Sequence, residues 1–340
     1  MLLAESVTPL GAPMQTRLLA LLALVFVVAV SAPGSAGATT PGANGPLAFE
    51  LFSPATGFTG QVARISPHGT NRRVLTAPAP GEPPQPEWSP DGRRIAFVRC
   101  TGEESSCNVW VMRRNGTHQR QVTHCAPQWC FGNLSPAWSP DGRWILFERD
   151  QRNGAGENRP GLFLIRPDGT QMHRLTRAPI DRDTSHTEGQ YSPDGRWIVF
   201  TQVIHESEDP NHLFVISANG GSAHRLTPPG LDSDNPDWSP DGGWIIFTGH
   251  PQVPGVEFTA NIYVIHPDGS GMRRLTHSKA GEGFDFFASW SPNGARIVFN
   301  HADPQVDDLF TMNRRGTAIR RVTHTKDVFE LRADWGPAIH

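Results

Sequence analysis

The sequence carries little excess charge of either sign, and its longest hydrophobic run is short. Its 30 Lys and Arg residues stand against 33 Asp and Glu residues, for a formal net charge of -3. This balance indicates neither a nucleic-acid-binding surface nor a membrane-binding patch. The longest uncharged run, residues 18–30, falls short of the roughly 20 residues that a membrane-spanning helix needs. No helical period of useful length follows it, which excludes a helical domain in the rest of the chain.

Sequence signatures of common catalytic and metal sites are also absent. There is no G-x-S-x-G nucleophile elbow, and the nearest string, from Gly220 to His224, ends in the wrong residue. The spacing of the cysteines does not match the paired CxxC pattern of structural zinc sites. The sequence therefore offers no nucleophile of the hydrolase type, and zinc remains only the alternative to disulfide bonds.

The four cysteines are close together in the chain, at Cys100, Cys107, Cys125 and Cys130. Three pairings are possible in principle. We favour Cys100 with Cys107 and Cys125 with Cys130, because each of these pairs closes a short local loop. The role predicted for both bonds is structural.

The N-terminal segment is typical of a secretory signal peptide. Arg17 precedes the hydrophobic run and Ala36-Gly37-Ala38 follows it, which predicts cleavage after Ala38. A retained anchor is the alternative. We expect residues 1–38 to be removed and residues 39–340 to be secreted or to reside in the periplasm or cell envelope, where disulfide bonds form.

One short phrase recurs about every 50 residues, which is a propeller or solenoid period. It first appears as EWSPDGRRIAF and returns in four further copies, followed by a truncated one. Each copy centres on an aromatic anchor followed by a turn that Pro, Asp and Gly favour. The anchors are Trp88, Trp138, Tyr191, Trp238, Trp290 and, in the truncated copy, Trp335.

Each period predicts four short strands, and the ends of the chain predict how the array closes. The anchor strand is followed by a β-branched and aromatic run, a third alternating strand, a glycine turn and an outer strand that ends in Leu-Thr or Val-Thr. The first period lacks an anchor strand, whereas the last, from Phe329, has nothing but one. We therefore predict an all-β fold, a six-bladed β-propeller of four-stranded antiparallel blades whose first blade is closed by the C-terminal strand.

The phrase Trp-Ser-Pro-Asp-Gly, together with the later segment VWVMRRNGTHQRQVT (residues 109–123), resembles the TolB-like repeat, also called the PD40 or WD40-like repeat. The resemblance covers nearly all of residues 39–340 and implies a six-bladed propeller, in agreement with the spacing. The periplasmic protein TolB carries an α/β domain before its propeller, and related peptidases carry a hydrolase domain. We expect this chain to correspond to the propeller alone.

The variable segments before the anchors hold the candidate binding residues, because the loops that enter the innermost strands surround the central opening of a propeller. The polar residues predicted at this opening are His186, Glu188, Asp232, Asp234, Asp285 and Glu330, with Glu82 and Asn133 as further candidates. An acidic opening suits a cation or a basic side chain of a partner. The competing interpretation is structural, since polar residues of inner strands also bond backbone amides between blades. We predict no cofactor and no catalytic residue, with Ca²⁺ in the central channel as the alternative.

The function that these features favour is an exported, non-catalytic binding scaffold. Its expected partner is another exported protein or a component of the cell envelope, and the protein is expected to be a monomer. A carbohydrate-active lyase or hydrolase that works at the central opening with carboxylates and His186 is the alternative, and a sensor of small ligands or metal ions is the third. The fold alone does not choose among them.

Overall fold

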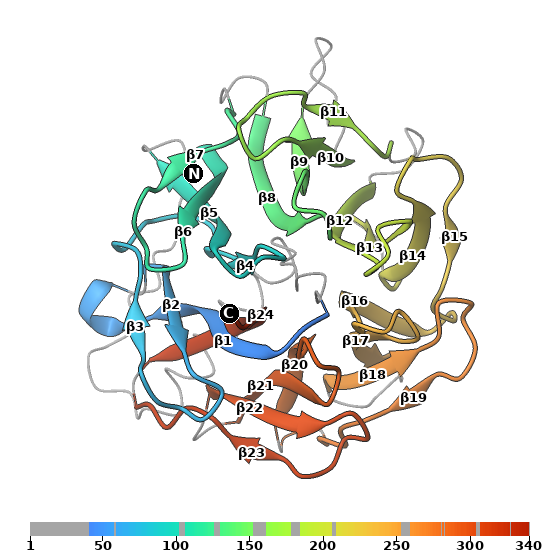
Figure 1. Ribbon diagram of the computed structural model, residues 1–340. Helices are drawn as coiled ribbons and strands as arrows, with labels where there is room; N and C mark the ends of the chain where they lie inside the picture. The colour runs from blue at the N-terminus through green and yellow to red at the C-terminus, as the bar shows by residue number, and fades with distance from the viewer. Residues whose placement is uncertain are drawn as a thin grey trace, which may run out of the picture. The chain divides into compact units, whose positions relative to one another are not determined.

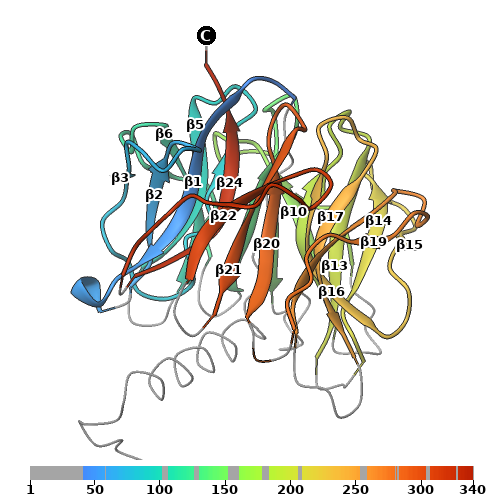
Figure 2. The ribbon, with the colours of Figure 1, turned by 90° about the horizontal axis from the view of Figure 1, so that it is seen from below.

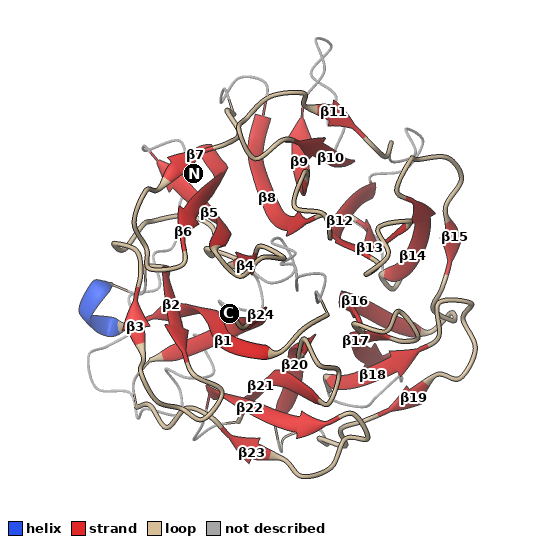
Figure 3. Cartoon of the chain, in the orientation of Figure 1, coloured by secondary structure: helices blue, strands red, loops and turns tan. Residues whose placement is uncertain are grey.

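The regular structure of the described residues consists of β-strands and one short 3-10 turn, Pro54–Thr56 (Figure 3). The computed structural model describes residues 41–339 except 58, 102–105, 126–129, 152–160, 178–183, 206–208, 253–258, 280, 282, 304–306 and 327. The predicted signal peptide lies outside the described residues. Residues 34–340 form one compact unit, to which the following account refers.

Six sets of four antiparallel strands are arranged in a ring, which confirms the predicted β-propeller (Figure 1). From the inner to the outer strand, blades 1 to 3 consist of β24 (Phe329–Pro337), β1 (Asn44–Phe52), β2 (Gln61–Ile65) and β3 (Arg73–Val74); β4 (Glu87–Trp88), β5 (Arg94–Thr101), β6 (Ser106–Arg113) and β7 (Arg120–Gln121); and β8 (Cys130–Trp138), β9 (Ile145–Gln151), β10 (Gly161–Ile165) and β11 (His173–Arg174). Blades 4 to 6 consist of β12 (Thr184–Tyr191), β13 (Trp197–Ile204), β14 (His212–Ser217) and β15 (His224–Arg225); β16 (Leu231–Trp238), β17 (Ile245–Pro251), β18 (Asn261–Ile265) and β19 (Arg273–Arg274); and β20 (Phe284–Trp290), β21 (Arg296–Ala302), β22 (Asp307–Asn313) and β23 (Arg320–Arg321).

Blades 2 and 3 share one eight-stranded sheet, whereas each of the other four blades is a separate four-stranded sheet. The link is a parallel pairing of β6 with β8 at Cys107 and Gly132. All other strand pairs within these two blades are antiparallel, as in the rest of the ring. The shared sheet therefore joins two neighbouring blades at a single residue pair.

The C-terminal strand closes the ring as the sequence predicts. β24 pairs with β1 along its length, from Asn44 opposite Pro337 to Phe52 opposite Phe329. The side chain of Trp335, the anchor of this strand, is almost fully buried, and its indole N–H donates to the carbonyl oxygen of Gly45 at 3.1 Å. The two ends of the propeller thus form one blade, in which neither end leaves an inner strand unpaired.

The repeated phrase encodes a hydrogen-bonded turn between the first and second strands. In the first copy, Ser89 Oγ donates to Asp91 Oδ1 at 2.6 Å, and the backbone N–H groups of Arg93 and Arg94 donate to Asp91 Oδ1 and Ser89 Oγ. The same bonds recur in the next three copies. In the fifth copy Asn293 takes the place of the Asp. The recurring Asp is therefore a turn residue.

The threonine of each outer strand has one structural role in all six blades. Its hydroxyl oxygen accepts a hydrogen bond from a backbone N–H of the third strand, at 2.9–3.1 Å. The six bonds join Val62 to Thr76, Val109 to Thr123, Leu162 to Thr176, Leu213 to Thr227, Ile262 to Thr276 and Leu309 to Thr323. The Leu-Thr and Val-Thr steps of the sequence are thus needed for sheet pairing.

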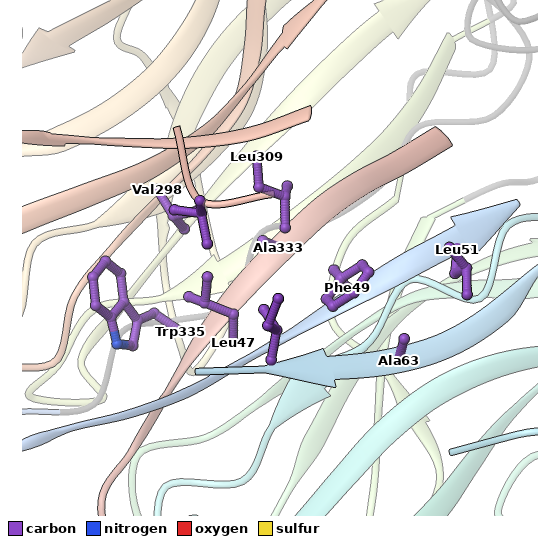
Figure 4. Close-up of a cluster of buried hydrophobic side chains, with 10 residues drawn as sticks. Leu47, Phe49, Leu51, Ala63, Val298, Leu309, Ala333 and Trp335 are labelled. Carbon is purple, nitrogen blue, oxygen red and sulfur yellow. The ribbon is translucent and has the colours of Figure 1, made fainter. Parts of the chain in front are cut away.

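The hydrophobic core lies between the blades. Among the described residues, one buried cluster spans each of the six junctions. At the junction of blades 6 and 1, Phe49 and Trp335 of blade 1 lie against Val298 and Leu309 of blade 6 (Figure 4). Alternate residues of a strand point to opposite faces of its sheet, so each second and third strand contributes to two junctions.

Both predicted disulfide bonds are present, Cys100–Cys107 between β5 and β6, and Cys125–Cys130 before β8. Loops this short are expected to restrict the unfolded chain by roughly 2 kcal/mol for each bond. We predict that replacing Cys100 and Cys107 together by Ser lowers the midpoint of urea unfolding. A reductant should lower the midpoint of the natural protein further than that of this variant, and a midpoint insensitive to reductant would contradict a stabilising role.

Candidate functional site

The innermost segment of each blade contains one residue in the left-handed backbone region, three positions before the aromatic anchor. None of the six is glycine, and their φ angles lie between 43° and 53°. In five blades the register between the first and second strands shifts at this residue, which defines a β-bulge. The six bulge residues are Gln85, Ser135, Glu188, Asn235, Phe287 and Arg332.

The bulges connect the blades around the axis. At five junctions the bulge N–H of one blade donates to a side chain of the preceding blade, in an arrangement that we call the hub ring. The donor and acceptor atoms are Gln85 N and Glu50 Oε1 (3.0 Å), Ser135 N and Gln85 Oε1 (2.7 Å), Asn235 N and Glu188 Oε2 (2.7 Å), Phe287 N and Thr248 Oγ1 (3.3 Å), and Arg332 N and Asn300 Oδ1 (3.0 Å). Polar side chains of the hub ring therefore satisfy buried backbone groups.

Glu188, one of the predicted binding residues, is a member of the hub ring. Its Oε2 accepts hydrogen bonds from Asn235 N–H and from the Thr201 hydroxyl, each at 2.7 Å. Burial and the nearby carboxylate of Asp234 raise the pKa of Glu188 to about 8. A buried carboxyl group with two donors on one oxygen stabilises the contact between blades 4 and 5, which is a structural role.

Arg332 is a buried cation within the hub ring. Its Nε lies 3.8 Å from Glu50 Oε2, and its guanidinium lies 4.1 Å from the centre of the Phe287 ring. Burial raises the pKa of Glu50 to about 7, although the charge of Arg332 acts in the opposite direction. The sequence reasoning missed both Glu50 and Arg332 as members of the hub.

Asp232 and Asp234, at the beginning of β16, form an acidic pair with one histidine between them and the core. Asp234 Oδ2 lies 3.2 Å from His250 Nε2, and a quarter of the Asp234 side chain is exposed. Asp232 accepts a hydrogen bond from the backbone N–H of Asn211. Burial and repulsion by Asp234 raise the pKa of Asp232 to about 6. This pair therefore has an electrostatic deficit of positive charge that a cation would relieve.

Asp285 belongs to a second pair of Asp and His side chains. His301 Nδ1 lies 2.7 Å from Asp285 Oδ1, and Ser278 Oγ donates to Asp285 Oδ2 at 2.7 Å. The hydrogen bond to Asp285 raises the pKa of His301, against the effect of burial. Asp303 lies 3.6 Å from the other ring nitrogen of His301. This arrangement holds a histidine that is protonated more readily than usual.

Glu330 and His186 are placed at the corresponding position of their inner strands, five residues before the anchor, and have different partners. Glu330 Oε1 lies 2.9 Å from Arg72 Nη2. His186 lies with its ring centre 4.8 Å from that of Phe200. Burial lowers the pKa of His186 to about 4, assisted by the charge of Arg174. His186 is consequently a neutral, packed imidazole at physiological pH.

The two further candidates also have local partners. Asn133 donates to Asn108 Oδ1 and accepts from Arg149 Nη1, each at 3.0 Å. Burial raises the pKa of Glu82, with the charge of Arg332 opposing it. Of the predicted residues, the structure thus brings Glu188, Asp232 and Asp234 into one electrostatic group and gives each of the others its own partners.

Within the described ranges, no three His, Cys, Asp or Glu side chains are grouped so that they could hold a metal ion. In the same part of the chain, no helix is both long and apolar enough to span a membrane. Ca²⁺ in the channel therefore stays a prediction. A sequence signal for the hub ring does exist, since the residue after the recurring Phe of the second strand is polar in five of the six blades: Glu50, Glu148, Thr201, Thr248 and Asn300.

The blades, the closing strand and the hub ring define a β-propeller with four-stranded blades. The chain belongs to the TolB β-propeller family, because the model of the TolB beta propeller domain (PD40) matches residues 61–254. TolB from Acinetobacter baumannii has a similar structure, with a TM-score of 0.66 and 22% identity over 86% of this chain and 67% of that chain.

Two other similarities concern proteins named as enzymes. An oligogalacturonate lyase in complex with manganese is similar with a TM-score of 0.50 and 15% identity, over 84% of this chain and 74% of that chain. A Bacillus subtilis (strain 168) protein named uncharacterized peptidase YuxL is 28% identical over 161 residues, which cover 38% of this chain and 24% of that protein. The chain thus matches about a quarter of that relative, and the likeness to the lyase shows the fold alone.

Proposed function

We propose that this protein is an exported binding scaffold that recruits a partner from the cell envelope or the secreted proteins and carries out no turnover. Two disulfide bonds support residence in an oxidising compartment. The hub ring supports a non-catalytic centre, because its polar groups are engaged in bonds that hold the blades together. The propeller then presents its loops as a rigid surface.

The observation that carries this proposal is the acidic pair at the beginning of β16. Asp232 and Asp234 repel each other, and the pKa of Asp232 is raised to about 6. A lysine or arginine side chain of a partner would relieve this repulsion on binding. The partner segment that fits is therefore basic, and its affinity should fall below pH 6, where Asp232 becomes protonated.

We predict that replacing both residues by Asn weakens binding of a basic partner at least tenfold at pH 7.5. The measurement is fluorescence anisotropy with a labelled oligo-arginine peptide, accompanied by cross-linking capture from the envelope and secreted fractions of the host. The matched control carries Asp168→Asn and Asp268→Asn, two carboxylates in exposed turns of blades 3 and 5. Equal loss in the control and in the Asp232→Asn/Asp234→Asn variant would contradict a specific acidic site.

The alternative function is a carbohydrate-active lyase or hydrolase, and the Asp285–His301 pair is the observation that favours it. A histidine bonded to a carboxylate at 2.7 Å is a common arrangement for proton transfer. Incubation with oligogalacturonate is the direct test. Turnover that is lost in His301→Gln would establish the enzyme and refute the scaffold.

A further inference from the structure

A cleft of about 800 Å³ opens above blade 1, at the end of the propeller where the chain ends (Figure 2). We call it the arginine cleft, because residues of blades 6, 1 and 2 place guanidinium groups along its walls. These residues are Arg64, Arg73, Arg114, Arg296, Arg320 and Arg321. No carboxylate of the described residues lines it.

The positive charge of the cleft is poorly compensated. Arg321 forms an ion pair with Asp308, whereas no described carboxylate forms an ion pair with any of the other five arginines. Arg64 and Arg73 face each other in register on β2 and β3, and like charges in this position destabilise a sheet. Burial and the charges of Arg114 and Arg73 lower the pKa of Arg64, and its buried Nε donates to no described acceptor.

Arg64 occupies a strand position that is apolar in most of the other blades. It lies opposite the residue three positions before the outer-strand threonine. The residues at the same place in blades 2 to 6 are Val111, Leu164, Val215, Val264 and Thr311. Packing between blades thus favours a small aliphatic side chain here, and blade 1 carries a cation instead.

The corresponding cavity between blades 3 and 4 shows what the repeat normally provides. It measures about 500 Å³ and is lined by Trp144, Asp141 and Asp194, among others. In the arginine cleft, Arg296 takes the place of Trp144. Neither neighbouring turn supplies an Asp, since blade 6 has Asn293 and the truncated copy after Trp335 lacks the turn altogether. Compared with the other junctions, this one therefore lacks acidic groups and carries additional basic groups.

We propose that the arginine cleft binds a small molecule that carries two or more phosphate groups. Five guanidinium groups without ion pairs favour a ligand with several negative charges, and one phosphate group carries about -1.5 to -2 at pH 7, against -1 for a carboxylate. Guanidinium forks match the oxygens of phosphate in pairs. The volume is that of a small-molecule site and exceeds what a single phosphate fills.

The test is calorimetric titration of the full-length protein with inorganic tripolyphosphate in 0.1 M NaCl, with Arg64→Val as the principal variant. This substitution installs the residue found at the same place in blades 2, 4 and 5, so the fold is retained. We expect the natural protein to bind and Arg64→Val to bind at least tenfold more weakly. The matched control is Arg273→Gln, which removes the cation at the strand position of Arg73 and Arg320 in blade 5, outside the cleft.

Comparison of ligands then distinguishes the possible sources of phosphate. Tighter binding of ATP than of tripolyphosphate assigns the cleft to nucleotides, and the reverse assigns it to inorganic or non-nucleotide phosphates. Binding of citrate as tight as that of tripolyphosphate would refute the assignment to phosphate. Absence of tripolyphosphate binding, or equal weakening by Arg273→Gln and Arg64→Val, would overturn the site itself.

Discussion

A chain that ends at Val328 should lose most of its stability or fail to fold. The deletion removes β24, the inner strand of blade 1, and with it the buried side chains of Leu331 and Trp335. Burial of one large apolar side chain is worth about 1.5–3 kcal/mol, and a folded domain has only about 5–15 kcal/mol to lose. We expect the melting temperature to fall by more than about 15 °C, since each kcal/mol corresponds to about 2–4 °C in a large domain.

The loss should reach beyond blade 1. Asp334 accepts a hydrogen bond from the backbone N–H of Trp88 at 2.6 Å, which joins β24 to blade 2. Arg332 N–H donates to Asn300 on the other side, in blade 6. Deletion of β24 therefore leaves buried groups unpaired at both neighbouring junctions, at a cost of about 1–3 kcal/mol each.

Differential scanning calorimetry measures this effect, and a shorter deletion provides the control. A chain that ends at Ala338 keeps β24 and the hydrogen bond from Ala338 N–H to the carbonyl oxygen of Ala43. It should melt close to the natural protein. An unchanged melting temperature after deletion from Phe329 onward would contradict the ring closure.

The repeat makes much of this fold predictable from the amino-acid sequence. The anchors, the turn residues and the outer-strand threonines recur at fixed places in each period, and the turn residues and threonines make the same hydrogen bonds wherever they recur. The absence of an anchor strand before Asn44 and the solitary one at Trp335 predict the closure. The two disulfide bonds follow from loop length alone.

The directions of the polar side chains before the anchors could not be predicted in the same way. The bulge three positions before each anchor interrupts the alternation of side chains along the inner strand. Six different residue types occupy that position, from Phe287 to Arg332, so no sequence signature marks it. Glu188 consequently bonds the next blade, and Glu330 pairs with Arg72.

The electrostatics of Arg64 could have been found from the sequence by comparing the blades. Aligning the third strands places Arg64 with Val111 and Val264, and this contrast requires no coordinates. What the sequence could not provide is the neighbourhood of that residue, because Arg296 and Arg320 reach the same cleft only through the closure of the ring. Departures from a repeat therefore become informative when the positions that meet across a junction are known.

The stability of the propeller should fall as the pH rises from 6.5 to 8. Burial raises the pKa of Glu50 and of Asp334 to about 7, and that of Glu188 to about 8. In the unfolded chain these groups titrate near 4, so the native state binds more protons in this window and loses stability as they dissociate. The expected loss is on the order of 1 kcal/mol for each group.

The window is chosen so that His186 does not interfere. Its pKa is lowered to about 4 by burial, so the unfolded state binds more protons than the native state only between about pH 4 and 6.5. In that lower range His186 makes stability rise with pH, opposite to the buried carboxyl groups. Above pH 6.5 its imidazole is neutral in both states, while His301, whose pKa is raised by Asp285, adds to the loss.

Replacement of Glu188 by Gln isolates one carboxyl group. The amide oxygen of Gln still accepts from Asn235 N–H and the Thr201 hydroxyl, but it does not ionise. We expect this variant to melt at a higher temperature than the natural protein at pH 8 and to show a smaller decrease between pH 6.5 and 8. Asp168→Asn, in an exposed turn, should leave the decrease unchanged. A Glu188→Gln variant with the natural pH dependence would show that Glu188 is ionised throughout this range, and the hub ring would then contain a permanent buried charge.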